Sequence, residues 1–314
     1  MTKKTSPKED FVYQFSASGK FGKPKAKCFS ACLSGLYRSD DGGKTWQPAF
    51  GSLNLQEPLT AQAVVIPPDF DREPSVFVGL AGGILRSLDG GQNWESAYVP
   101  SPPPVISTLA MSPNYDEDGL LFAGTVEDGI LSSTDRGRRW NTANFGLLDL
   151  NVLCLTLSPD FAKDETIFAG TQSGIFRSTN GGRSWREVNL SIGFQAVLCL
   201  TLSPNFATDA TLFAGTEHHG LLRSTDGGLT WQRLAKSVLR HPINSILLAP
   251  DFHKRPEMLI LEGGNPMLST DGGKSWEIWR EEMQAGKDVT AVYAPHGFES
   301  TALIGFSDGT ILCI

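Results

Sequence analysis

The chain has 314 residues, a formal net charge of −7, and hydrophobic side chains at 40% of its positions. An acidic chain of this kind lacks the electrostatic footprint of a protein that binds nucleic acid or an anionic membrane surface. Its apolar runs are also far shorter than the roughly 20 residues that a membrane-spanning helix needs, so we expect no membrane insertion.

The N-terminal segment, Met1 to Asp10, is polar and lysine-rich, and no apolar signal segment follows it. We therefore expect residues 1–10 to be a flexible tail and the protein to be cytoplasmic. The cysteines agree with that compartment because their number is odd and their spacing is not that of a disulfide framework. They are Cys28, Cys32, Cys154, Cys199 and Cys313.

The first strand-like segment, Phe11 to Ser18, either begins the first structural repeat or closes the last one. After it the phrase Ser-x-(Asp/Asn)-x-Gly-x-x-Trp occurs six times, and its tryptophans follow one another at intervals of 45 to 48 residues. The acidic or amide residue and the tryptophan of each copy are Asp41 and Trp46, Asp89 and Trp94, Asp135 and Trp140, Asn180 and Trp185, Asp226 and Trp231, and Asp271 and Trp276. A period in this range, with short apolar runs between turn residues, is typical of a β-propeller blade of four strands.

The fourth repeat shows the predicted blade most clearly. Val152 to Ser158 is a first strand, Thr166 to Thr171 a second, and Gly174 to Ser178 a third; Trp185 opens the fourth. In the turn before Trp185, we expect the short polar side chain to accept hydrogen bonds from turn amides and glycine to supply a positive φ. The tryptophan would cover the hairpin, so we interpret these phrases as structural rather than catalytic.

A second recurrent phrase, proline followed by Asn or Asp and an aromatic residue, stands between the first and second strands, as in Pro159-Asp160-Phe161. Proline presets the turn, and the ring is expected to plug the edge of the blade. Alignment on these prolines places Cys154 and Cys199 at equivalent positions of successive first strands, where they are expected to be small core residues. Near the C-terminus, Asp288 to Ala294, Ala302 to Phe306 and Thr310 to Ile314 match the first three strands of a further blade.

These observations predict an all-β protein in which residues 11–314 form a single seven-bladed β-propeller of four-stranded antiparallel blades. The end of the seventh blade has no box phrase, and an open sheet edge is an aggregation hazard. We therefore expect the N-terminal strand or another element to cover that edge.

The box phrase resembles the Asp-box, or BNR repeat, of sialidases, sortilin-type receptors, xyloglucan-active glycosidases and photosystem II assembly factors. Sialidases use an arginine triad and a Tyr/Glu pair, and this chain lacks their Arg-Ile-Pro phrase. Its recurrent arginines, Arg38, Arg86, Arg177 and Arg223, each directly precede a box serine, which favours a repeated structural role. The xyloglucan-active enzymes resemble two facing propellers, whereas the assembly factors resemble single seven-bladed ones.

The inter-blade loops are the candidate binding surface because they are unusually apolar and are expected to share one face of the ring. The predicted partner-binding residues are Tyr98, Phe145, Leu147, Leu148, Ile192, Phe194, Glu217 and His218. Adjacent histidines in an extended segment point to opposite sides, so His218 and His219 make a poor ligand pair and we expect no metal and no cofactor.

The sequence therefore favours a non-enzymatic propeller that acts as a protein–protein interaction scaffold, assembly factor or subunit, with a partner protein of unknown identity. The alternative is a glycan-binding or glycoside-hydrolysing propeller. In that case carboxylates such as Glu127, Glu217 and Glu262 would gather at the axial mouth.

Overall fold

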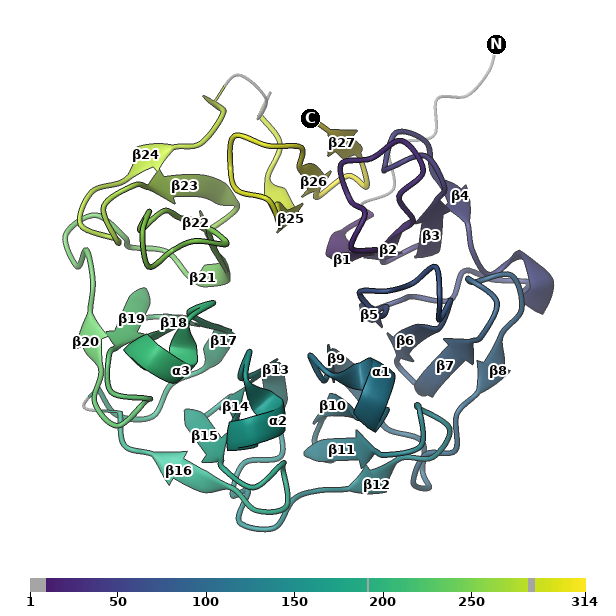
Figure 1. Ribbon diagram of the computed structural model, residues 1–314, viewed down its shortest axis with the longest axis horizontal. Helices are drawn as coiled ribbons and strands as arrows, with labels where there is room; N and C mark the ends of the chain where they lie inside the picture. Colours follow the sequence, from purple (N-terminus) through teal and green to yellow (C-terminus); the bar gives the residue numbers. More distant parts are fainter. Residues whose placement is uncertain (1–9, 191, 282–285) are drawn as a thin grey trace.

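The computed structural model describes residues 10–190, 192–281 and 286–314, which form seven antiparallel sheets around a central axis (Figure 1). The sheets are numbered here as blades 1 to 7 in chain order, and within each blade neighbouring strands are also neighbours in sequence. This arrangement confirms the predicted all-β, seven-bladed propeller. Among the described residues, no helix is long and apolar enough to cross a membrane.

Within each blade the strands are arranged in chain order from the central axis to the periphery (Figure 1). The innermost strands are β1 (Val12–Ala17), β5 (Ala63–Val65), β9 (Val105–Met111), β13 (Val152–Leu157), β17 (Val197–Leu202), β21 (Ile243–Leu248) and β25 (Val289–Tyr293). The second strands are β2 (Cys28–Cys32), β6 (Val76–Leu80), β10 (Leu121–Val126), β14 (Ile167–Thr171), β18 (Leu212–Thr216), β22 (Met258–Glu262) and β26 (Leu303–Phe306).

The third strands of blades 1 to 6 carry the box serines at their ends, and the fourth strands are short. The third strands are β3 (Gly35–Ser39), β7 (Gly83–Ser87), β11 (Ile130–Ser133), β15 (Ile175–Ser178), β19 (Leu221–Ser224), β23 (Asn265–Ser269) and β27 (Ile311–Cys313). The fourth strands are β4 (Gln47–Pro48), β8 (Glu95–Ser96), β12 (Asn141–Thr142), β16 (Arg186–Val188), β20 (Gln232–Arg233) and β24 (Glu277–Ile278).

The proline-containing turns between first and second strands contain a single helical turn in blades 3, 4 and 5. These are α1 (Tyr115–Asp118), α2 (Phe161–Asp164) and α3 (Phe206–Asp209); a 3-10 turn covers Gly51–Leu53 in the linker after blade 1. The predicted aromatic plugs are confirmed, since Phe161 is 4% exposed. Its ring meets Phe122 of the preceding blade edge-on, with centroids 6.3 Å apart. Four further pairs of this kind join consecutive blades, so aromatic contacts contribute to each of these seams.

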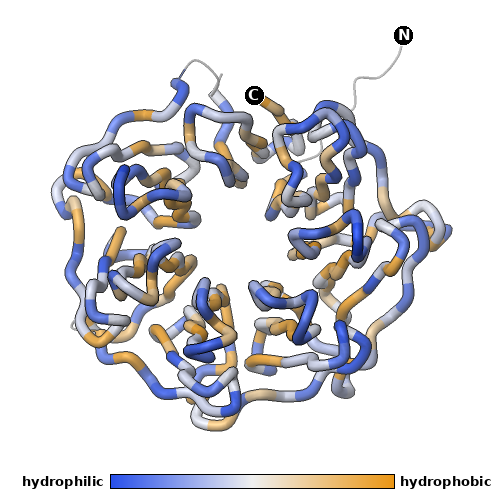
Figure 2. Tube along the Cα trace, viewed as in Figure 1, coloured by the Kyte–Doolittle hydropathy of each residue, from blue (hydrophilic) through white to orange (hydrophobic). Residues whose placement is uncertain are grey.

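Hydrophobic residues follow the strands around the axis, whereas the connecting turns are more hydrophilic (Figure 2). Glycine in the second strands lets neighbouring blades approach. A Cβ added to Gly170 would lie 2.5 Å from Cys154 Sγ, and one added to Gly215 would lie 2.5 Å from Cys199 Sγ and from the carbonyl oxygen of Ile243 in the next blade. The close approach of one blade to the next therefore excludes a side chain at these two positions.

Polar side chains on the innermost strands bond to the backbone of the next innermost strand around the ring. Ser107 Oγ donates to the Val152 carbonyl at 2.5 Å, and Thr201 Oγ1 donates to the Ile246 carbonyl at 2.7 Å. In blade 1, Gln14 and Ser16 instead accept from backbone amides of blade 2. An inner strand has an unpaired edge, and these links satisfy part of its backbone polar groups.

Of the two places that the sequence left open for the N-terminal strand, the structure confirms the first: the strand begins blade 1 and does not close blade 7. β1 is the innermost strand of blade 1, and the seam to blade 7 is closed by side chains. Phe21 meets Tyr293 edge-on at 5.2 Å, and the Tyr293 hydroxyl donates to the Ala17 carbonyl at 3.4 Å. Within the described ranges no strand pairs with the outer edge of β27.

Of the predicted tail, residues 1–9 lie outside the described residues. Asp10 is described, and its backbone forms a bridge with Asp308 in the turn before β27. Its carboxylate accepts hydrogen bonds from the amide and hydroxyl of Ser34 at 2.9 and 2.6 Å. Asp10 thus belongs to the seam between blades 7 and 1.

Candidate functional site

The polar side chains of the box turns form hydrogen bonds within their own turns. In blade 5, Ser224 Oγ donates to Asp226 Oδ1 at 2.7 Å and accepts the Gly228 amide at 2.9 Å. The amides of Leu229 and Thr230 donate to the same carboxylate oxygen. The Thr230 hydroxyl and amide and the Ser224 hydroxyl lower the pKa of Asp226 to about 2. The carboxylate is therefore held ionised as a turn acceptor, as the sequence predicted.

Blade 4 shows that the box works without a charge. Asn180 Oδ1 accepts the Ser178 hydroxyl and the Ser184 amide, both at 2.9 Å, while Asn180 Nδ2 donates to Ser184 Oγ at 2.8 Å. The amide thus reproduces the acceptor role of the carboxylate. What the turn requires is a short side-chain oxygen at this position.

The box tryptophans lie in the seams between consecutive blades. Trp140 and Trp185 are 3% and 2% exposed, and the other four are half-buried. Their indole N–H groups bond either to the carbonyl of their own box glycine or to the preceding inter-blade linker. Trp185 Nε1, for example, donates to the Ala143 carbonyl at 2.7 Å. None of the box tryptophans lines the five pockets found among the described residues, as a substrate platform would.

The recurrent arginines also act at blade seams, which agrees with a repeated structural role. Arg38 Nη1 donates to the Gly90 carbonyl in the next box turn at 3.2 Å, and Arg86 does the same to Arg136 at 3.5 Å. Arg86 also pairs with Glu95 on its own blade at 2.7 Å. Arg177 and Arg223 lie over phenylalanine rings of their own blades.

The predicted apolar loop surface is only partly exposed. Phe145, Leu148, Phe194 and Tyr98 have exposed fractions of 79%, 78%, 82% and 65%. Leu147 is only 7% exposed and packs in the core between blades 3 and 4, so its side chain is not on the surface as predicted.

Ile192 and Tyr98 also engage the scaffold. Ile192 is half-buried against the core between blades 4 and 5. The Tyr98 backbone bridges to Arg139 in the next box turn, whose guanidinium lies 5.5 Å from the Tyr98 ring centroid. These loops therefore use some of their apolar residues to lock one blade to the next.

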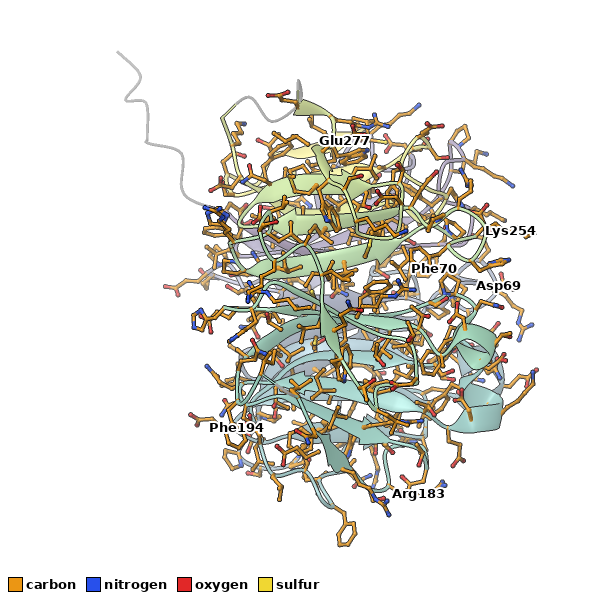
Figure 3. All side chains as sticks on the ribbon, turned by 90° about the vertical axis from the view of Figure 1, so that its left-hand side faces the viewer. Asp69, Phe70, Arg183, Phe194, Lys254 and Glu277 are labelled. Atoms are coloured by element: carbon orange, nitrogen blue, oxygen red, sulfur yellow. The ribbon has the colours of Figure 1, made fainter. Side chains whose placement is uncertain are left out.

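The exposed loop residues do not share one pocket among those found in the described residues. Phe145 borders a groove beside the box turn of blade 4, together with Phe161, Glu165 and Arg183. Phe194 lies on the opposite side of the ring from Asp69 and Phe70, as the edge-on view shows (Figure 3). The Phe145 carbonyl accepts the Trp185 amide, so the loop of Phe145 is tied to the box of blade 4.

The acidic and histidine residues of the second-to-third strand loops do not form a catalytic cluster. Glu217 and His218 are exposed and lie 3.6 Å apart. Glu262, in contrast, is 7% exposed, and its carboxylate accepts the backbone amides of Arg240 and His241 at 2.6 and 3.0 Å. Glu262 therefore anchors the linker between blades 5 and 6. Within the described ranges, no group of three His, Cys, Asp or Glu side chains could hold a metal ion.

The cysteines are free thiols without features of a reactive site. Burial raises the pKa of Cys154 to about 12 and that of Cys28 to about 12. Cys154 Sγ and Cys199 Sγ each point at a carbonyl of the following blade, Val197 at 3.6 Å and Ile243 at 3.3 Å. The predicted equivalence of their positions is confirmed, but each is partly rather than fully buried.

The sequence analysis missed the outer grooves between blades. One of them, about 490 Å³ in volume, lies between the outer strands of blade 4 and the box turn of blade 5. Its lining includes Arg177, Arg186, Val188 and Leu229. Arg186 directly follows a box tryptophan and faces a box arginine, so its position in the repeat was the available signal.

Comparisons with known proteins agree with this geometry. The model of the BNR/Asp-box repeat matches residues 37–48. The solved structure titled "YCF48 bound to D1 peptide" is 17% identical, with a TM-score of 0.72 over 98% of this chain and 94% of that one. YCF48 from Cyanidioschyzon merolae is 15% identical, with a TM-score of 0.67 over 99% of this chain and 97% of that one.

A glycosidase has the same architecture. The GH74 xyloglucanase from Xanthomonas campestris is 16% identical, with a TM-score of 0.73 over 96% of this chain. This chain spans about half of that enzyme, 51% of its length. No curated protein matches the sequence. With six hydrogen-bonded boxes in seven radial blades, the chain is a β-propeller that carries Asp-box repeats, the first of which the BNR/Asp-box model matches.

Proposed function

We propose that this chain is a non-enzymatic propeller that binds a partner protein and acts as a scaffold, assembly factor or subunit. The observation that carries the proposal is the exposure of large apolar side chains on ordered inter-blade loops, above all Phe145, Leu148 and Phe194 at 79%, 78% and 82%. Large apolar side chains held exposed on a rigid scaffold are typical of protein interaction sites.

The structural neighbours support the same class of function. One YCF48 structure carries a D1 peptide, and this chain covers almost the whole of that propeller. The likeness supports the use of a single propeller as a protein-binding platform, while the identity of the partner here is open to experiment.

The alternative is a glycan-binding or glycoside-hydrolysing propeller, which the fold similarity to a GH74 xyloglucanase favours. Against it stands Glu262, whose carboxylate is already bonded to two linker amides. Glu127 and Glu217 lie on loops of different blades, blade 3 and blade 5. Glycosidases need two carboxyl groups flanking the scissile bond. A glycoside screen and a glycan array that both gave a signal above a denatured control would favour this alternative.

The proposal is tested by partner recovery from cells of the native host, with the wild-type chain and two variants, Phe145→Ser and Phe194→Ser, as baits. Leu88→Ser is the matched control because Leu88 is 54% exposed but lies on a box turn. We expect a protein that is recovered with the wild type and with Leu88→Ser but lost with at least one loop variant. Equal recovery by all four baits would contradict a loop-mediated interaction.

The cytoplasmic location is likewise a proposal, supported by five free thiols in the described part of the chain. Fractionation of native cells with an antibody against the chain tests it. Recovery from an oxidising compartment would contradict it.

A further inference from the structure

Equivalent grooves open on the periphery of the ring, each between the outer strands of one blade and the box turn of the next. Their volumes are about 410 Å³ between blades 1 and 2, 480 Å³ between blades 3 and 4, and 490 Å³ between blades 4 and 5. The three grooves lie at similar places in the repeat but are lined by different side chains. Their charges differ most.

In two of the grooves the cations are neutralised by carboxylates of the same chain. Between blades 1 and 2, Asp40 pairs with Lys27 at 2.9 Å and with Arg38 at 3.2 Å. Between blades 3 and 4, Arg183 pairs with Glu165 at 2.6 Å. These grooves therefore offer little net charge to a ligand.

The groove between blades 4 and 5 differs because two arginines face each other across paired strands. Arg177 on β15 and Arg186 on β16 are direct register partners. At the same position of blade 2 the partners are Arg86 and Glu95, which form an ion pair. In blade 4 an arginine replaces the glutamate, so two positive charges lie on one face of the hairpin. Like charges directly opposite on paired strands are unfavourable unless an anion lies between them.

The two guanidinium groups have no anionic partner among the described residues. Neither forms a salt bridge or side-chain hydrogen bond there, and Arg177 Nε is buried without an acceptor. The nearest aromatic contact of Arg177 is the ring of Phe168, whose centroid is 5.5 Å away. Arg38 Nε and Arg223 Nε are buried without acceptors at the same repeat position, so this atom is a feature of the repeat. What distinguishes this groove is that two guanidinium groups line it, and a bound carboxylate would pair with both of them.

The rest of the lining combines polar groups with apolar side chains. Thr179 and Asn189 supply a hydroxyl and an amide. Glu187 is the one carboxylate in the lining, so the two arginines leave the groove with a net positive charge. Leu229 lies at the rim and is 68% exposed. A second hollow of about 210 Å³ shares Glu187 and Asn189 with the groove and extends to Phe194. An extended ligand could therefore run from the arginines to the apolar loop.

We propose that this groove binds an extended acidic peptide segment of the partner, in which carboxylates alternate with apolar residues. The proposal rests on the proposed function, since it names the part of the partner that is recognised. The planar fork of arginine suits bidentate pairing with carboxylates, and the adjacent apolar side chains would pack on Leu229 and Phe194. The chain as a whole has a net charge of −7, so a cationic groove would draw an acidic ligand to this one place and favour it over a neutral ligand.

The test uses the purified full chain and three fluorescent hexapeptides in anisotropy titrations. The probe alternates Asp and Leu; one control replaces Asp with Asn, and the other replaces Leu with Ser. We expect the Asp-Leu peptide to bind about tenfold or more tightly than either control. Undetectable binding of this peptide, or equal binding of all three, would overturn the proposal. Binding of inorganic phosphate as tight as that of the Asp-Leu peptide would also overturn the proposal, because it would show a site for a simple anion.

A charge reversal locates the site. Arg186→Glu recreates the ion pair of blade 2, so the variant is expected to fold as the wild type does and to bind the Asp-Leu peptide at least about tenfold more weakly. Lys254→Glu, on a turn of blade 6 (Figure 3), makes the same charge change away from the groove and should leave binding unchanged. An equal effect of the two variants would indicate long-range electrostatics and overturn the site.

Partner recovery then separates this inference from the proposed function. Loss of the partner with Arg186→Glu supports the groove. If the partner is lost with Phe145→Ser or Phe194→Ser but retained with Arg186→Glu, the groove is wrong and the protein-binding function stands. If all variants retain it, both the groove and the loop-mediated interaction are wrong.

Discussion

Blades 1 to 6 and blade 7 solve the same packing problem with different residues. Each of the first six has a fourth strand and a box whose tryptophan enters the seam with the preceding blade. Blade 7 has three strands, and Cys313 occupies the position of the box serine, opposite Leu303 in the sheet. The seam between blades 6 and 7 is filled instead by Trp279, which is 5% exposed and donates its indole N–H to the Phe298 carbonyl at 3.3 Å.

This difference shows that the fold requires a large aromatic ring to fill each of these seams, whether or not a box phrase supplies that ring. Trp279 follows a box by three residues, where the other repeats carry the smaller Ala49, Ala97, Ala143, Val188 and Leu234. At five seams, from that between blades 1 and 2 to that between blades 5 and 6, the large ring comes from the box of the following blade. At the sixth the ring comes from the linker, so the same volume is filled from the other side.

The largest expected effect comes from removing either kind of seam tryptophan. Trp185→Ala and Trp279→Ala should each lower the free energy of unfolding by about 3–5 kcal/mol, because both leave a cavity between two blades. Chemical denaturation monitored by circular dichroism measures the loss. A small effect at Trp279 with a large one at Trp185 would break the equivalence of the two seams.

The next largest effect is expected at turn glycines, where an alanine substitution should destabilise a box turn more than a turn of blade 7. Gly182 in the box of blade 4 has φ +80°, and an added Cβ would lie 2.7 Å from Phe122. Gly297 in blade 7 has φ +97° with open space around it. Gly182→Ala is therefore expected to cost about 2–3 kcal/mol and Gly297→Ala about 1 kcal/mol, measured by the same denaturation. Equal costs would mean that crowding does not distinguish the turns.

The serine position gives a smaller contrast. Ser224 Oγ accepts the buried Gly228 amide, so Ser224→Ala should cost about 1 kcal/mol. Cys313 Sγ instead donates a weak bond of 3.5 Å to the Gly42 carbonyl in blade 1. Cys313→Ala should therefore shift the unfolding midpoint less than Ser224→Ala does. A larger shift would show that Cys313 holds the ring closed.

The smallest expected effect is on the stability of the protein at acidic pH. The pKa of Asp226 is lowered from 3.8 to about 2 in the folded chain, so its stabilising contribution is complete above the unfolded value. That contribution is lost as the pH falls from about 4 towards 2. Asp226→Asn copies the neutral box of blade 4 and should show a weaker loss of stability between pH 5 and pH 3 than the wild type. Urea titrations at both pH values test this, and an unchanged pH dependence would contradict it.

The sequence by itself determined the repeat and therefore the fold. The spacing of the box tryptophans, the Asn or Asp and glycine of each turn, and the aromatic plugs are local signals, because each acts within one hairpin or across one seam. The predicted strands of blade 4 match β13 to β16 for the same reason.

Only the tertiary structure decided which loop residues are exposed and how the ring closes. Leu147 and Leu148 are adjacent and chemically identical, yet one is 7% and the other 78% exposed, because the next blade covers only the first. The place of β1 in blade 1, the anchoring of Glu262, and the meeting of Arg177 with Arg186 likewise depend on which segments pack together. Burial and charge pairing are properties of neighbours in space, and a local pattern in the chain does not specify those neighbours.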